Sequence, residues 1–257
     1  MLFVFGLVLL SFVFLLQPSG RAMLFPPFSA HRSNRRLTRI LLVCIALTLA
    51  GNLIALLTIS SQDVRNDGDE VGFYLTVTMV SLLLALFLFE FAGISLRDDV
   101  AARRNSAATA TLCGLILGEG FCLAGSNSGN GPGAEAVFFC VAISTVVLFL
   151  AWVVFDALSG VVERITVERD FAAGIRAGAF LAGTGAILGG AVAGNWASFG
   201  RTLSDLVRFG WPAAVLIVSA VGAESLLGKR GAVFSVAYAV VVFALCVAYA
   251  ARIWGLS

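Results

Sequence analysis

The sequence predicts an all-α polytopic membrane protein of about eight transmembrane helices, arranged as repeated α-hairpins. Hydrophobic residues make up 60% of its 257 residues, charged residues only 12%, and the mean hydropathy is +0.99. Charged residues approach about a quarter of a soluble domain, so the bilayer is the main solvent of this chain. Two further observations support the prediction: a series of apolar segments of spanning length, and an internal repeat.

Eight apolar segments come near the length needed to cross a bilayer. About 30 Å of hydrocarbon requires roughly 20 helical residues, with a range of about 17–25. A signal peptide is the rival interpretation of the first segment, but no positive charge precedes its apolar run, which favours a spanning helix. Prolines that follow it mark a loop. The segments are residues 1–17, 38–60, 72–95, 106–126, 135–160, 171–196, 206–227 and 231–252.

The distribution of basic residues predicts an orientation, because cytoplasmic loops are enriched in Lys and Arg. The loop after the first segment has five arginines and no acid, whereas the next loop has four acids and only Arg65. Extended along the chain, this pattern places both termini on the non-cytoplasmic side. We favour a bacterial cytoplasmic membrane because no cleavable targeting signal is recognised, with an organellar inner membrane as the alternative.

The stretch from Phe89 to Gly125 has a second version 65 residues later. The first copy reads FEFAG, a charged run, then NSAATATLCGLILGEG; the second reads FDALSG, a charged run, then DFAAGIRAGAFLAGTG. Such self-similarity indicates one repeated unit, here an apolar helix, a short charged loop and a small-residue helix. With the predicted topology the chain divides into four hairpins that point the same way, as in parallel repeats.

At these residues the chain resembles a family of polytopic membrane proteins, domain of unknown function 350 (DUF350). The resemblance covers about residues 71–195 and rests on Asn105, Ala107 and Ala108 with glycines about four residues apart. In the second copy Asp170 replaces the Asn. The resemblance implies a helical integral membrane protein and brings no established activity. Accordingly, we divide the chain into an N-terminal helix pair with a basic cytoplasmic loop (1–70), the tandem hairpin repeat (71–197) and a C-terminal helix pair (198–257).

The small-residue helices carry glycines four residues apart, which lie on one helix face and let two backbones approach closely in lipid. Packing within the bundle is one interpretation, and a self-association face is the other; the second would make a homo-oligomer. The glycines concerned are Gly114, Gly118, Gly174, Gly178, Gly185 and Gly189.

Four acids are candidates for an ion or solute path, because acids within a membrane usually face protein or water and are functional candidates by default. Glu119 is the deepest, with Thr184 at the matching position of the next copy. It is either a protonated packing residue or a coupling site. Glu90, Asp156 and Glu224 lie nearer the cytoplasmic boundary, where they either line a polar ring or pair with arginines. Arg176 is expected to pair with Asp170 or Glu168, with extension of its side chain toward the interface as the alternative.

The basic loop, the cysteines, the net charge and the single histidine limit the possible partners and chemistry. Arg32, Arg35 and Arg36 lie in the basic loop, where anionic lipid headgroups are the expected contact and a soluble partner is the alternative. The five cysteines lack metal-ligand spacing, the net charge of +2 does not indicate a nucleic-acid surface, and no cofactor motif is present. A single His excludes His-based zinc and Ser-His-Asp sites, so we expect no enzyme.

Two functions of different classes follow from these observations. The first is a channel or carrier for ions or small cations, for which the four acids should face a common interior. The second is a structural or accessory subunit of a larger membrane complex, for which the acids should meet arginines instead.

Overall fold

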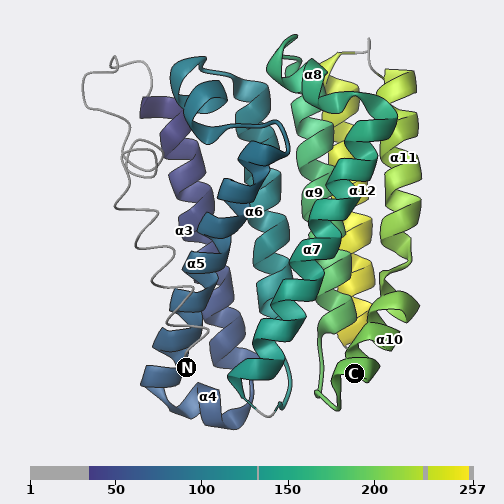
Figure 1. The fold of residues 1–257 in the computed structure, drawn as a ribbon. Coiled ribbons are helices and arrows are strands. Elements are labelled where there is room, and N and C mark those ends of the chain that lie inside the picture. Colours follow the sequence, from purple (N-terminus) through teal and green to yellow (C-terminus); the bar gives the residue numbers. More distant parts are fainter. Residues whose placement is uncertain (1–34, 132, 228–230, 255–257) are drawn as a thin grey trace.

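The computed structural model describes residues 35–131, 133–227 and 231–254, and this part of the chain is helical with no strand (Figure 1). Seven of its helical segments are long and apolar enough to cross a membrane. The chain is therefore an integral membrane protein. The elements are α3 (Arg35–Thr58), α4 (Gln62–Asn66), α5 (Gly68–Phe91), the π-helix η2 (Leu96–Ala102), α6 (Ser106–Ser126), α7 (Ala134–Ser159), α8 (Val161–Thr166), α9 (Phe171–Val192), α10 (Phe199–Gly210), α11 (Pro212–Leu227) and α12 (Ala232–Trp254).

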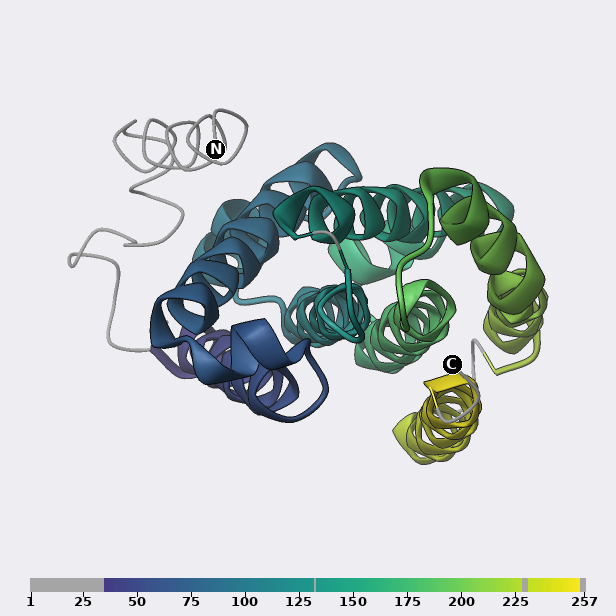
Figure 2. The same ribbon diagram turned by 90° about the horizontal axis from the view of Figure 1, so that it is seen from below.

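The long helices form two curved rows (Figure 2). The inner row runs in the order α3, α6, α9, α12, and each of these helices packs on the next. The outer row is formed by α5, α7 and α11, which cover α6 and α9. The order helix, short helix, long helix occurs twice, as α5–η2–α6 and as α7–α8–α9.

The closest contact in the molecule is between α6 and α9, whose backbones touch along their length. A Cβ atom added at Gly118 would lie 2.5 Å from the Leu181 carbonyl oxygen, and one at Gly114 would overlap the backbone of Gly178. Only glycine fits at such positions. All six glycines singled out by the sequence lie in this contact within a single chain, which leaves no room at them for a second copy.

Polar side chains fix where the helices begin. Asn105 accepts hydrogen bonds from the Ala107 and Ala108 amides at the start of α6 (2.9 and 3.2 Å), and Asp170 accepts one from the Ala172 amide at the start of α9 (2.9 Å). Both residues supply the oxygen that an N-cap requires. The amide of Asn105 also donates to the Ile165 carbonyl (2.6 Å), and this second bond requires the amide group.

Seven of the eight predicted segments contain a described helix, with ends displaced by a few residues. Residues 1–17, the eighth, lie outside the described residues. The segment predicted as 206–227 belongs to a longer run, Phe199–Leu227, in which α10 and α11 are separate helices. The break falls at Trp211 because Pro212, with no amide hydrogen, occupies the first position of a helix and starts α11.

Candidate functional site

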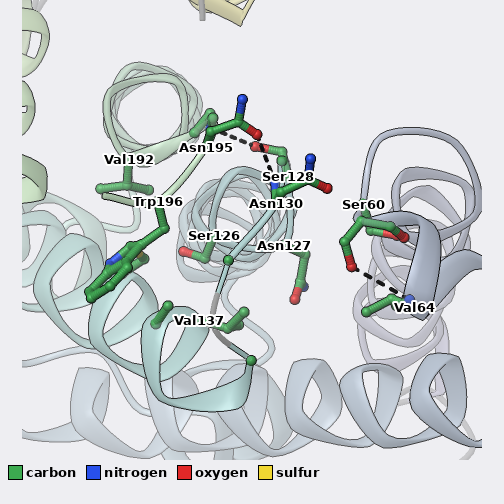
Figure 3. Close-up of a pocket in the computed structure, with 18 of the residues that line it drawn as sticks. Ser60, Val64, Ser126, Asn127, Ser128, Asn130, Val137, Val192, Asn195 and Trp196 are labelled. Atoms are coloured by element: carbon green, nitrogen blue, oxygen red, sulfur yellow. Dashed lines mark hydrogen bonds between the residues drawn. The ribbon is translucent and has the colours of Figure 1, made fainter. Parts of the chain in front are cut away.

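A cavity of about 520 Å³ lies where α3, α6 and α9 end, at the end of the bundle that the charge pattern predicts to face outward (Figure 3). We call it the outer pocket. Its wall includes apolar and aromatic residues such as Leu56, Tyr74, Val137 and Trp196. Its charged lining consists of four carboxylates and one guanidinium: Asp63, Asp67, Glu70, Asp205 and Arg201.

Backbone hydrogen bonds connect the loops around this pocket. The Gly129 amide donates to the Ile59 carbonyl after α3 (3.0 Å), and the Trp196 amide after α9 donates to the Asn130 carbonyl (2.9 Å). The side chain of Asn195 accepts from the Asn130 amide (2.9 Å). Three inner-row helices are thus joined at one end by their own C-terminal loops, which gives the pocket a fixed frame.

Asn127 is the most deeply placed amide of the pocket lining. It is 8% exposed, and its Oδ1 atom is buried with no hydrogen-bond partner in the described part of the chain. Figure 3 shows its side chain extending into the space between Val137 and the segment from Ser60 to Val64. Buried polar atoms in proteins are nearly always hydrogen-bonded, so an unpaired acceptor that borders a cavity is an exception that requires a reason.

Glu119 lies deeper in the bundle, on α6. It is 1% exposed, and its Oε1 atom accepts a hydrogen bond from the Thr145 hydroxyl of α7 (2.8 Å). Its Oε2 atom has no partner among residues 35–131, 133–227 and 231–254. Ser126 of the pocket lining is seven residues further along α6, two helical turns above Glu119 on the same face. Thr184, at the matching position of α9, is also fully buried with an unpaired hydroxyl.

Glu90 and Asp156 are half-buried at the opposite end of the bundle, where they bind the connections that follow their helices. The Ser95 hydroxyl donates to Glu90 Oε1 (3.2 Å), and the Val162 amide donates to Asp156 Oδ1 (2.8 Å). A similar bond forms at Asp99, which is 4% exposed and accepts from the Ser95 amide (2.9 Å). Both candidate acids therefore hold connecting segments in place.

Glu224 is buried in an ion-pair network that joins three helices. Arg176 of α9 donates to its two carboxylate oxygens from Nε (2.6 Å) and Nη2 (2.8 Å), and to the Ser235 hydroxyl of α12. Arg164 binds both Glu224 and Asp170, the latter at 2.7 Å. The expectation that Arg176 would pair with Asp170 or Glu168 is wrong, because α9 turns Arg176 toward α11, and Asp170 is bound by Arg164.

The structure does not gather the four candidate acids around one interior. Glu119 alone is buried away from charged partners, Glu90 and Asp156 bind connecting segments, and Glu224 meets two arginines. Of the basic-loop residues, Arg32 lies outside the described residues, the side chain of Arg35 is not described, and Arg36 is exposed in the first turn of α3. Across the described residues no group of three His, Cys, Asp or Glu could hold a metal ion.

Sequence reasoning missed the outer pocket and its amides. The acids of the loop before α5 contributed only to the predicted orientation in the membrane. The Gly-rich loop after α6 has no basic residue and was not considered as a site. One signal was present: Asn130 and Asn195 are 65 residues apart, the same spacing as the repeat. That spacing predicts matched positions at the ends of α6 and α9, where the two residues are hydrogen-bonded.

The family model of Domain of Unknown Function (DUF350) matches residues 66–192, the segment from the start of α5 to the end of α9, which confirms the resemblance found in the sequence. No curated protein and no solved structure matches the chain.

Proposed function

Because residues 66–192 of this chain form a DUF350 domain, we propose that it is a non-enzymatic integral membrane protein that carries ions or small cations across the bilayer through a bundle of hairpin repeats. The observation that carries the proposal is Glu119. A carboxyl that is 1% exposed within a spanning helix, with one oxygen unpaired, is costly to place in a membrane and marks a functional site by default.

The polar side chains that lie between Glu119 and the outer pocket support this role. Cys122 and Ser126 lie on the same face of α6 between Glu119 and the pocket, and the Ser144 hydroxyl of α7 is buried one residue from Thr145, the partner of Glu119. Polar side chains therefore extend from the pocket toward Glu119. In the proposed path a cation or proton would pass from the pocket along these side chains, which are buried in this conformation, to the Glu119 carboxyl.

Aromatic packing in the inner half of the bundle favours a carrier over an open channel. Trp152 packs on Phe89 with ring centroids 4.9 Å apart and on Phe155 at 5.9 Å, and Phe155 packs on Phe180 at 4.6 Å. All four rings are buried. This aromatic packing supports a conformation that is closed on the inner side, so transport would require a second conformation that opens inward.

Flux through the purified protein in liposomes tests the proposal. We expect the parent to conduct monovalent cations or protons, and Glu119→Gln, which keeps the shape and removes the ionisable group, to abolish that flux. Glu168→Gln is the matched control, because Glu168 is an exposed acid at the inner end. Equal flux in the parent and in Glu119→Gln would refute the role of Glu119, and no flux from folded parent protein would refute the carrier.

A structural or accessory subunit of a larger membrane complex is the second candidate, and Glu224 favours it. Its contacts with Arg164 and Arg176 are the pattern expected when acids stabilise the fold rather than line a path. Partner subunits would then cover part of the apolar surface, and the basic loop would contact anionic headgroups. Purification from mild detergent as a single monodisperse species without co-purifying subunits would contradict this candidate.

The host membrane, the orientation in it and the repeat of hairpins are part of the same proposal. We place the protein in a bacterial cytoplasmic membrane with the outer pocket on the non-cytoplasmic side, as the arginines of the connecting loops favour. The matched caps at Asn105 and Asp170 support a repeat of parallel hairpins. Left-handed backbone at Arg104 and Arg169, again 65 residues apart, supports it independently.

A further inference from the structure

We infer that the outer pocket is a binding site for a small organic cation that carries an ammonium group on an apolar body. The inference deepens the proposed function, on which it rests, by naming the class of solute that the carrier would take. Three features of the pocket carry it: an unpaired acceptor at depth, an excess of carboxylates, and an apolar wall.

The acceptor is Asn127 Oδ1, which is buried beside the cavity and has no hydrogen-bond partner among the residues that the structure describes. An amide oxygen accepts hydrogen bonds and cannot donate them, so the matching ligand group is a donor. A bond from a charged donor is stronger than one from a neutral donor. An ammonium group in the pocket would satisfy this oxygen.

The charges around the pocket select for a cation. Four carboxylates line it against one guanidinium, and that guanidinium is engaged: Arg201 Nε donates to Asp205 Oδ2 at 2.9 Å. Asp63, Asp67 and Glu70 remain as exposed acids of the α4–α5 segment. A pocket lined mainly by one sign of charge raises the local concentration of the opposite ion.

The size and lining of the pocket favour an organic cation over a metal ion. Its volume of about 520 Å³ falls within the range of roughly 300–1,000 Å³ that is typical of small-molecule sites. The acids are too dispersed for a metal, since no group of three ligands occurs among residues 35–131, 133–227 and 231–254. Tyr74 and Trp196 add aromatic rings, which attract ammonium groups.

Equilibrium dialysis of radiolabelled n-butylammonium against the full-length protein in nanodiscs, with empty nanodiscs subtracted, tests the inference. We expect saturable binding that excess unlabelled butylammonium displaces and that equimolar sodium, n-butanol or butyrate does not. Asn127→Leu removes the acceptor and keeps the volume, and it should weaken binding at least about tenfold, which corresponds to about 1.4 kcal/mol. Asn127→Asp should strengthen binding, because it replaces the amide with a carboxylate.

Asp63→Asn combined with Glu70→Gln should also weaken binding at least about tenfold, and this pair guards against misfolding because both residues are exposed. Glu168→Gln, at the opposite end of the bundle, should bind as the parent does. Binding no greater than to empty nanodiscs, binding unchanged in all pocket variants, or displacement by equimolar sodium would each overturn the inference. If the parent shows flux that Glu119→Gln abolishes but binds no butylammonium, this inference alone is overturned. If the parent binds butylammonium but shows no flux of any kind, the carrier proposal alone is overturned.

Discussion

The ion-pair network at Glu224 allows a quantitative prediction, because substituting different members leaves different buried charges without a partner. Glu224→Leu leaves Arg176, whose side chain is 1% exposed, with only the Ser235 hydroxyl. Arg176→Met leaves Glu224 paired with Arg164, and the double variant leaves Arg164 paired with Asp170. Glu224→Leu therefore leaves a buried arginine without a carboxylate, whereas Arg176→Met leaves the buried carboxylate with one arginine. The double variant leaves no buried charge unpaired.

The expected costs follow from this difference. Removing one partner of a buried ion pair costs about 3–5 kcal/mol, whereas replacing the whole pair with apolar residues is often neutral or stabilising. We therefore expect Glu224→Leu to reach that full cost, Arg176→Met to cost clearly less, and the double variant to recover most of the loss. For a chain of this size each kcal/mol corresponds to roughly 2–4 °C in Tm, so Glu224→Leu should lower the Tm by roughly 6–20 °C.

The Tm of the detergent-solubilised protein, followed by the loss of its monodisperse chromatographic peak after heating, is the measurement. Arg201→Gln is the control, because the Arg201–Asp205 pair has the same chemistry with the arginine 62% exposed, and exposed pairs contribute only about 0–1 kcal/mol. A Tm of Glu224→Leu within the range of this control would refute the reasoning. So would a double variant no more stable than Glu224→Leu.

Three further predictions concern packing, capping and orientation. Gly118→Ala should destabilise by about 1–3 kcal/mol in the same assay, because its methyl group meets a carbonyl oxygen of α9, whereas Gly222→Ala, with nothing within 4 Å, should be neutral or stabilising. Asn105→Ala should cost about 0.5–2 kcal/mol for the lost cap, and an unchanged Tm would show that the cap contributes nothing. In a cysteine-free background, a membrane-impermeant maleimide added to intact cells should label Asp63→Cys and spare Glu168→Cys; the reverse labelling would invert the topology.

The sequence was sufficient for the positions of the spanning helices to within a few residues at most of their ends. Apolar runs of spanning length determine the helices, because backbone groups in hydrocarbon must bond within their own segment. The Asn105 pattern likewise predicts the start of α6, since a cap acts over two or three residues of sequence. Such features depend on residues that are close together in the chain, so they can be predicted from the sequence.

Features that depend on the rotation of one helix against another were not predictable. Arg176 has Asp170 six residues away, yet it pairs with Glu224, 48 residues away, because α9 directs that face toward α11. Asn127 likewise reads as one polar residue in a loop, and only the joining of three helix ends places it beside a cavity. Separation along the sequence suggests which nearby residues could pair, but it gives no information about pairings between distant helices.

If the protein is the carrier proposed above, the backbone contact between α6 and α9 restricts which of its parts can move during transport. The two backbones are so close that a Cβ atom added at these glycines would overlap the facing helix. A shift of α6 along α9 by one residue, about 1.5 Å, would therefore bring the backbones into collision, and we expect these two helices to move together as one rigid spine. The outer row has no such lock: α5 and α7 end near Gly93 and Gly160, both with positive φ, and rejoin the spine through η2 and α8. An inward opening would therefore come from the outer helices tilting against a stationary spine, with those two glycines as the pivots.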